Sequence, residues 1–244
     1  MVITSLENEK IKEFVRLQKK KYRDLTNTYI VEGEHLVIEA DKANVVDEII
    51  LLEGEECNYN YPVCYVTLDI LRKISTMDTA PKIMAVCHKN SNSFIVGDKI
   101  LVLDGIQDPG NLGTIIRSSL AFDVSTIVLL ENTVDLYNPK VLRATQGMYN
   151  HINIINLNIE EVFSYTKKNN INVYGTSVLD GVDVRNLNNS LKEKYCLIMG
   201  NEGQGIRKEI LNICDKNLYI KMNDKVESLN VGVACSILLY ELRG

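Results

Sequence analysis

The sequence predicts an α/β protein, with a mostly parallel sheet in its larger carboxy-terminal part and a small α/β domain before it. From about residue 97 onwards, short apolar runs alternate with amphipathic stretches, which is the pattern of strands joined by helical crossovers. The segment KNSNSF, residues 89–94, is polar and rich in serine and asparagine, as domain linkers often are. A chain of 244 residues is long enough for two modest domains.

The first part should form a compact α/β domain. A helix is expected over residues 6–22, where Ile11, Phe14 and Val15 mark the inner side. Apolar runs rich in β-branched residues then predict strands, and the amphipathic stretches between them predict helices. The expected strands are 28–33, 46–52, 63–67 and 83–88, and the further helices are 34–43 and 68–75.

The second part should form the parallel sheet, with helices on both faces. The expected strands are 99–104, 126–130, 152–157, 173–177, 195–199 and 218–222. The expected helices are 112–122, 159–168, 206–213 and one from about Ser228, with a further segment at 139–146. Ligands of such sheets bind outside the carboxyl ends of the strands, so the loops that follow the strands are the expected place for a site.

The last helix is apolar on almost every side. The residues that leave little room for a polar stripe are Leu229, Val231, Val233, Ala234, Ile237, Leu238, Leu239 and Tyr240. Such a helix should be buried on nearly all sides. It is expected to be covered by the rest of its domain, by a second subunit, or by both.

Composition and charge narrow the possible functions. The net charge of −5 argues against a protein that coats nucleic acid over its whole surface. No apolar run approaches the roughly 18 residues of a membrane span, and the amino terminus lacks a basic-then-apolar signal. The six cysteines are scattered without a CxxC pair, which speaks against a metal site and fits a reducing, cytoplasmic location.

The charge is uneven along the chain. Between Lys10 and Arg23 the only anion is Glu13. The seven cations of this stretch are Lys10, Lys12, Arg16, Lys19, Lys20, Lys21 and Arg23. A local excess of this size can hold several phosphates even on an acidic protein. A solvated helix face explains the same charges without RNA.

Three glycine-bearing loops each follow a short apolar run in the second part. They are DPGNLGTIIR (108–117), MGNEGQGI (199–206) and ESLNVGVACSILLYE (227–241). Loops at the ends of three parallel strands predict one site for a small polar ligand. They match neither the GxGxxG dinucleotide pattern nor the phosphate-binding P-loop. Taken singly, Ser228 is better explained as a helix cap and Arg117 as a surface side chain.

Taken together, the three segments resemble the three motifs of the SpoU (TrmH-like) branch of the SPOUT superfamily of RNA ribose 2′-O-methyltransferases. The matching stretches are NLGTIIRSSLAFD, IMGNEGQGI and IKMNDKVESLNVGVACSILLYE. Ahead of them, ITSLENEKIKEFVRLQKKKYR and YIVEGEHLVIEA are similar to an L30e-like RNA-binding module. The resemblance implies an L30e-like domain at 1–90, a linker at 91–98 and a SPOUT methyltransferase domain at 99–244.

The resemblance also implies an activity. The methyl donor would be S-adenosylmethionine, the acceptor a ribose 2′-hydroxyl of structured RNA, and no metal would be needed. The SPOUT fold implies a mostly parallel sheet with a carboxy-terminal trefoil knot, and the family implies a homodimer. An L30e-like module favours large-subunit ribosomal RNA as the substrate, with tRNA as the alternative.

Site residues follow from the same motifs. The implied catalytic residues are Asn111, Arg117, Glu202, Ser228 and Asn230. The implied cofactor-binding residues are Thr176, Ser177, Gly200, Asn201, Gly203, Ile220, Met222, Ser228 and Leu229. The RNA-binding residues are the seven cations of the basic stretch. A guanidinium has a pKa above about 12 and no acceptor atom, so Arg117 is expected to grip a phosphate and stabilise a developing alkoxide rather than act as a base.

Two other classes of function fit the sequence less well. A dinucleotide-dependent oxidoreductase needs a GxGxxG loop and a ribose-binding acid, and the sequence offers neither convincingly. A non-catalytic RNA-binding protein would have kept the L30e-like RNA-binding module and lost the methyl-transfer activity. The presence of Asn111, Arg117, Glu202, Ser228 and Asn230 speaks against that alternative.

Overall fold

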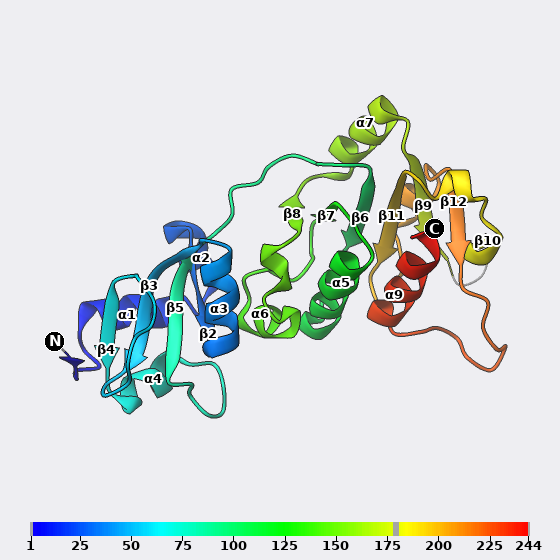
Figure 1. The fold of residues 1–244 in the computed structure, drawn as a ribbon. Coiled ribbons are helices and arrows are strands. Elements are labelled where there is room, and N and C mark those ends of the chain that lie inside the picture. Colours follow the sequence, from blue (N-terminus) through cyan, green and yellow to red (C-terminus); the bar gives the residue numbers. More distant parts are fainter. Residues whose placement is uncertain (1, 178–180, 244) are drawn as a thin grey trace. The chain divides into compact units, whose positions relative to one another are not determined.

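The structure is a computed structural model that describes residues 2–177 and 181–243. By its contacts the chain divides into two compact units (Figure 1). The first unit comprises Met1–Ser91 and Asp135–Asn150, and the second comprises Asn92–Val134 and His151–Gly244. Every helix in the described residues is too short or too polar to span a bilayer.

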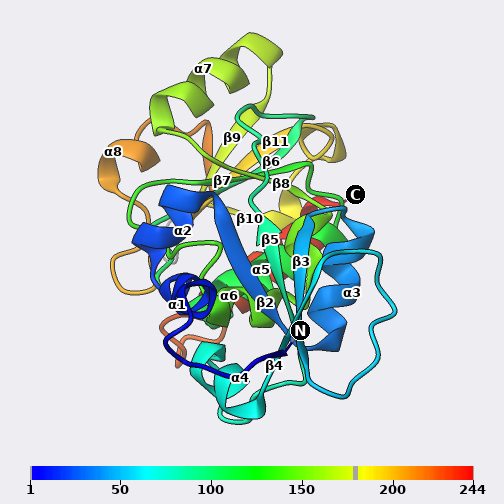
Figure 2. The same ribbon diagram turned by 90° about the vertical axis from the view of Figure 1, so that its left-hand side faces the viewer.

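The first unit contains a five-stranded mixed sheet. Its elements are β1 (Val2–Ile3), α1 (Glu9–Arg16), α2 (Lys20–Thr26), β2 (Thr28–Glu32), α3 (Glu34–Lys42), β3 (Val46–Leu52), β4 (Val63–Val66), α4 (Leu68–Ile74), β5 (Ile83–His88), α6 (Pro139–Thr145) and the 3-10 helix η1 (Met148–Asn150). The strand order is β1-β4-β3-β5-β2, and β5 runs antiparallel to both of its neighbours. Figure 2 shows the same sheet and its helices in a view turned by 90° from that of Figure 1.

Alternation along the strands assigns the two faces of this sheet. Ile11, Phe14 and Ile70, from α1 and α4, pack in one core with Ile30 of β2. The neighbouring residue Tyr29 points to the other face, where α3, α6 and η1 lie. Both faces are therefore covered, although β2 lies at the edge of the sheet.

The single helix expected over residues 6–22 is wrong, because the chain forms two helices there. Helix α1 ends at Arg16, and Lys19 is extended, with a ψ of 132°, before α2 begins. The Arg23 side chain donates to the carbonyls of Leu17 and Gln18, at 2.8 and 2.9 Å. This arginine satisfies carbonyl groups that a continuous helix would have paired.

Residues 135–150 form a strap that belongs to the first unit, although they lie far along the sequence. The Tyr29 and Tyr137 ring centroids are 4.5 Å apart, and the Tyr29 and Tyr149 hydroxyls are 3.0 Å apart. Burial raises the pKa of both Tyr29 and Tyr149, so these hydroxyls stay protonated. A Cβ on Gly147, whose φ is +82°, would lie 2.5 Å from the Glu39 side chain, so only glycine allows this close approach.

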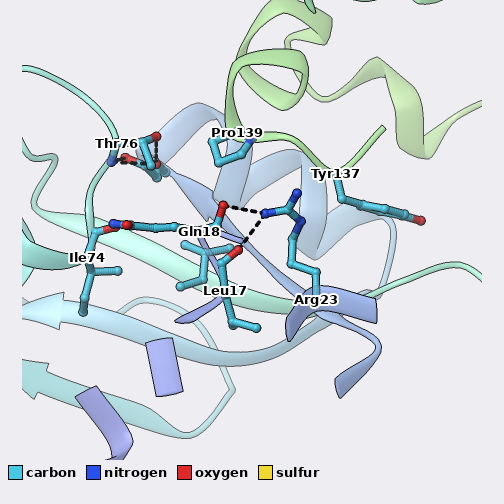
Figure 3. A pocket seen from close by; sticks show the side chains of 9 residues that line it. Leu17, Gln18, Arg23, Ile74, Thr76, Tyr137 and Pro139 are labelled. Carbon is cyan, nitrogen blue, oxygen red and sulfur yellow. Dashed lines mark hydrogen bonds between the residues drawn. The ribbon is translucent and has the colours of Figure 1, made fainter. Parts of the chain in front are cut away.

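Charged contacts also fix the strap. Asp135 accepts from the buried Arg23 at 2.5 Å, and Arg143 lies 3.5 Å from the buried carboxylate of Glu32. A hollow beside them, lined by Gln18, Arg23 and Tyr137 among others, has room for about one water molecule (Figure 3). It is far too small for a nucleoside.

The second unit contains the parallel sheet that the sequence predicts. Its elements are β6 (Lys99–Asp104), α5 (Pro109–Ala121), β7 (Thr126–Leu129), β8 (Asn153–Asn156), α7 (Ile159–Asn169), β9 (Asn172–Thr176), β10 (Val182–Asp183), η2 (Val184–Asn186), η3 (Asn189–Leu191), β11 (Tyr195–Gly200), α8 (Lys208–Leu211), β12 (Lys216–Tyr219) and α9 (Val231–Leu242). The strand order is β10-β12-β9-β11-β6-β7-β8, and every pair is parallel.

The last helix differs from its prediction in where it begins. It begins at Val231 rather than near Ser228, because Asn230 is the residue that caps it. Its inner side is buried against α5 and β11, with Cys235 and Leu239 fully inaccessible. Its outer side is open in this chain, since Val233 is 46% and Tyr240 is 64% exposed. Within this chain the helix is therefore covered on its inner side only, and cover of its outer side by a second subunit stays a prediction.

Candidate active site

The loops after β6 and β11 leave the same edge of the sheet side by side. Asp104 at the end of β6 is paired with Gly200 at the end of β11. The segment after β12 leaves at that edge too, because all strands run parallel. The three glycine-bearing segments therefore start from one edge, as their positions after strands predict.

Side-chain hydrogen bonds connect these three segments. Asn111 of α5 donates from Nδ2 to Glu202 Oε1 at 3.0 Å. Asn230 donates from its own Nδ2 to Asn111 Oδ1 at 2.8 Å. Asn111 thus bridges a carboxylate from the second segment and an amide from the third. We refer to Asn111, Glu202 and Asn230 as the amide bridge.

Helix capping orients both ends of the amide bridge. Asn230 Oδ1 accepts from the backbone N–H groups of Gly232 and Val233, at 2.9 and 3.2 Å, so its Nδ2 is directed away from α9 and towards Asn111. Asp108 caps α5 by accepting from the backbone of Asn111 at 2.8 Å. Asp108 is not among the residues predicted for the site, although an aspartate directly before a proline is a readable helix-start signal.

Close packing of α5 against α9 brings the asparagines together. A Cβ on Gly232 would lie 3.2 Å from the Thr114 side chain, which is tighter than ordinary contact. One turn further along, the hydroxyls of Ser118 and Ser236 are 2.7 Å apart. The position of the amide bridge is therefore set by two helices in direct contact.

Arg117 lies outside the amide bridge. It is an exposed residue of α5 and forms no hydrogen bond or ion pair with residues 2–177 or 181–243. Six residues separate it from Asn111, a rotation of about 240° around the helix axis. The two side chains therefore leave α5 on different sides, and this chain alone does not bring them together.

The loop after β11 folds back on itself. Asn201 and Gly205 exchange backbone hydrogen bonds of 3.1 and 2.9 Å, and Asn201 Oδ1 accepts from the backbone of Gly203 at 2.9 Å. A Cβ on Gly200 would lie 2.2 Å from the carbonyl carbon of Gly205. Glycine at position 200 is thus required for the loop to close.

The other cofactor candidates lie at the same edge. Thr176 is the last residue of β9 and Ser177 follows it, and Thr176 Oγ1 donates to the Ile198 carbonyl at 3.1 Å. After β12, Ile220, Met222 and Leu229 are half-buried. Ser228 is exposed, and it does not cap α9, contrary to the explanation of Ser228 taken singly.

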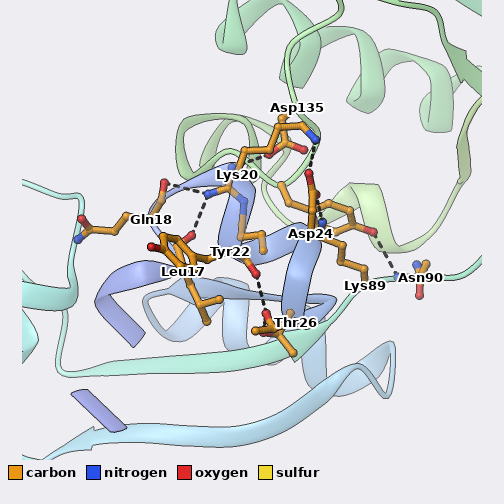
Figure 4. A network of polar contacts seen from close by, with 12 residues as sticks. Leu17, Gln18, Lys20, Tyr22, Asp24, Thr26, Lys89, Asn90 and Asp135 are labelled. Carbon is orange, nitrogen blue, oxygen red and sulfur yellow. Dashed lines mark hydrogen bonds and ion pairs between the residues drawn. The ribbon is translucent and has the colours of Figure 1, made fainter. Parts of the chain in front are cut away.

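The seven cations of the basic stretch differ in their partners. Lys10 pairs with Glu48, Lys12 lies 3.1 Å from both Glu7 and Glu9, and Lys20 lies 2.5 Å from Asp24. Hydrogen bonds from Lys20 and Lys89 lower the pKa of Asp24, so this cluster stays ionised (Figure 4). Within the described residues, Arg16, Lys19 and Lys21 have no ion pair, and Arg16 lies over the Tyr22 ring at 5.9 Å.

Arg23 is the exception among the seven. It is 3% exposed, and its hydrogen bonds go to Leu17, Gln18 and Asp135. Figure 3 shows its guanidinium turned inwards to the first two. The expectation that Arg23 contacts RNA does not fit this position, because the side chain is buried and both terminal nitrogens of its guanidinium donate inside the first unit.

Comparison with known proteins identifies the class. Residues 98–240 match the SpoU rRNA methylase family, and residues 8–85 match the MRM3-like substrate-binding domain. The chain belongs to the SpoU rRNA methylase family. The resemblance stated from the three motifs is confirmed.

Relatives of similar length extend this result. The 23S rRNA (guanosine(2553)-2′-O)-methyltransferase RlmP of Bacillus subtilis is 38% identical, over 99% of each chain. An AdoMet-bound rRNA methyltransferase from Sinorhizobium meliloti is 27% identical with a TM-score of 0.88, covering 100% of this chain and 97% of the other. The SpoU methyltransferase AviRb of Streptomyces viridochromogenes shares the fold, with 20% identity, a TM-score of 0.89 and 97% coverage of each chain.

Proposed function

We propose that this protein transfers a methyl group from S-adenosylmethionine to a ribose 2′-hydroxyl of 23S ribosomal RNA. The observation that carries this proposal is the amide bridge, which joins one polar residue from each of the three family segments. The full-length similarity to RlmP supports 23S rRNA as the substrate class. We take the guanosine equivalent to that named for RlmP as the first nucleotide to test.

The residues at the carboxyl edge of the sheet fit such a donor. Half-buried Ile220, Met222 and Leu229 offer apolar surface to an adenine ring, and the backbone around Gly200 and Gly203 offers polar groups, as in other nucleoside sites. When bound, the donor supplies a methyl group attached to a positively charged sulfur. Once the methyl group is transferred, this sulfur is part of a neutral thioether, which is the leaving group. Thr176, Ser177, Asn201 and Ser228 complete the proposed donor pocket.

The acceptor side needs groups that orient a hydroxyl and accommodate its developing charge. Glu202 is exposed. Within the described residues its Oε1 accepts from Asn111 at 3.0 Å and from the Asp108 backbone at 3.5 Å, so the carboxylate has capacity for the ribose hydroxyl. Asn111 and Asn230 hold that carboxylate in place. Arg117, an unpaired cation among the described residues, would bind the neighbouring phosphate and stabilise the alkoxide.

We further propose that the family's trefoil knot and homodimer are present here. The outer side of α9 supports the dimer, because Val233, Ile237 and Tyr240 follow one another at helical spacing and are exposed or half-buried. A second subunit would cover this apolar stripe.

Action on ribosomal RNA would place the protein in the cytoplasm.

A labelling experiment tests the proposed activity. Unmodified 23S rRNA and tRNA transcripts are incubated with the protein and tritiated S-adenosylmethionine, and the methylated ribose is mapped by primer extension. Label in the 23S rRNA alone is expected. Label confined to tRNA would support the alternative substrate, and RNA binding without any label would identify a non-catalytic RNA-binding protein.

The basic stretch allows a matched test of RNA binding. We expect Lys19→Gln combined with Lys21→Gln to weaken RNA binding and to lower the slope of log affinity against log salt by about 2, since both lysines lack an ion pair within the described residues. The control is Lys12→Gln with Lys20→Gln, which removes the same charge from lysines already paired. A slope unchanged from the wild-type protein would assign Lys19 and Lys21 to solvent.

A further inference from the structure

A partly buried ion pair lies directly beside the loop after β11. Asp104, the last residue of β6, is 5% exposed. Arg207, the residue before α8, reaches it from Nε at 3.0 and 3.2 Å and from an NH2 group at 2.9 Å. The backbone N–H of Arg207 donates to the same carboxylate at 3.3 Å. Neither residue is among those that the sequence motifs assign to the site.

The pair closes the loop against the end of β6. At the start of the loop, Asn201 Nδ2 donates to the carbonyl of Gly105 at 2.8 Å. At its end, Arg207 is held by Asp104. The consecutive residues Asp104 and Gly105 therefore bind both ends of loop 201–207. Asn201 also accepts hydrogen bonds from the backbone at the tip of the loop.

We infer that Asp104 and Arg207 are positioning residues that hold loop 201–207 in the conformation that binds the methyl donor and presents Glu202. This inference rests on the proposed function, because it concerns the same site. Glu202 is the second residue of the loop, directly after Asn201, and it accepts a hydrogen bond from Asn111 Nδ2. A shift of the loop would therefore move Glu202 out of the amide bridge.

The chemistry of the pair suits such a role. A buried carboxylate is costly unless it is paired and hydrogen-bonded, and Arg207 supplies a planar fork that fixes both distance and direction. The hydrogen bond to Asp104 raises the pKa of Arg207. The Arg207 side chain is 46% exposed, so replacing Arg207 should disturb the loop more than the core.

The test compares Asp104→Asn, Arg207→Gln and the double variant with a matched control. The control is Asp98→Asn, which removes an aspartate that is 3.6 Å from Lys194, at the opposite end of the same two strands. Calorimetry measures affinity for S-adenosylmethionine, and a filter assay measures RNA affinity. Hydrogen exchange of the Gly203 and Gln204 amides reports on the loop in protein without donor.

We expect each single variant to bind the donor about tenfold more weakly, with RNA affinity unchanged. The donor affinity of the double variant should be no lower than that of the single variant that binds more weakly, because the two residues act as one unit. The Gly203 and Gln204 amides should exchange faster in both singles than in Asp98→Asn. Arg207→Lys should recover part of the donor affinity, since it keeps the charge and loses the fork.

Unchanged donor affinity and loop exchange, with only a lower melting temperature, would overturn the inference and make the pair a purely structural contact. If Asp104→Asn fails to fold, Arg207→Gln decides the matter alone. Wild-type protein that binds no donor would overturn the proposed function together with this inference. Wild-type binding with unaffected variants overturns the inference only, so the two failures are distinguishable.

Discussion

Replacing Arg117 with alanine should lower the rate of methyl transfer by at least about 100-fold while leaving donor affinity within a few-fold. The size of this decrease follows from the loss of one preorganised group that faces developing negative charge. Arg117 is exposed and has no partner within the described residues, so its removal should not unfold the second unit. Single-turnover transfer of labelled methyl groups measures the rate, and calorimetry measures donor affinity.

Controls separate this role from a general effect of charge. Lys168→Ala removes an exposed cation from α7 and should leave the rate unchanged. Arg117→Lys should recover only part of the rate, since lysine keeps the charge but cannot bind a phosphate with two parallel hydrogen bonds. Equal loss of rate and donor affinity in Arg117→Ala would place this residue on the donor side instead.

Much of the second unit could be predicted because its pattern is local. The apolar runs at 99–104 and 195–199 each became a buried strand, β6 and β11, and their loops leave one edge of a parallel sheet. The expected α5 began at residue 112, whereas the helix starts at Pro109. The cap by Asp108 explains the difference, and it was present in the sequence.

Long-range contacts account for what could not be predicted. Residues 17–19 carry no glycine or proline, and the break between α1 and α2 depends on Arg23, whose guanidinium reaches back to the Leu17 carbonyl. The strap at 135–150 gives no sequence signal for its place in the first unit. The capping residue of α9 also depends on a long-range contact. Serine and asparagine cap helices equally well, and the hydrogen bond to Asn111 distinguishes Asn230 from Ser228.

The largest effect on stability should come from Asp135→Ala. Arg23 is 4% exposed in its side chain, and Asp135 is its charged partner at 2.5 Å. The Arg23 Nε atom already lacks a hydrogen-bond partner among the residues that the structure describes. The variant would therefore leave a buried guanidinium with the two carbonyls of Leu17 and Gln18. Removing one member of a buried pair costs about 3 kcal/mol or more in the free energy of unfolding. Urea denaturation followed by circular dichroism measures this change.

Two comparisons decide whether the loss comes from an uncompensated charge. Asp69→Ala removes an exposed aspartate 3.2 Å from Arg72, and such surface pairs contribute less than about 1 kcal/mol. Arg23→Met combined with Asp135→Leu should recover much of the stability, because apolar replacement of both partners removes the unpaired charge. A loss below about 1 kcal/mol for Asp135→Ala would mean that the tyrosine cluster of Tyr29, Tyr137 and Tyr149 holds the strap without the ion pair. The strap would then depend on packing, and Tyr149→Ala would become the more damaging substitution.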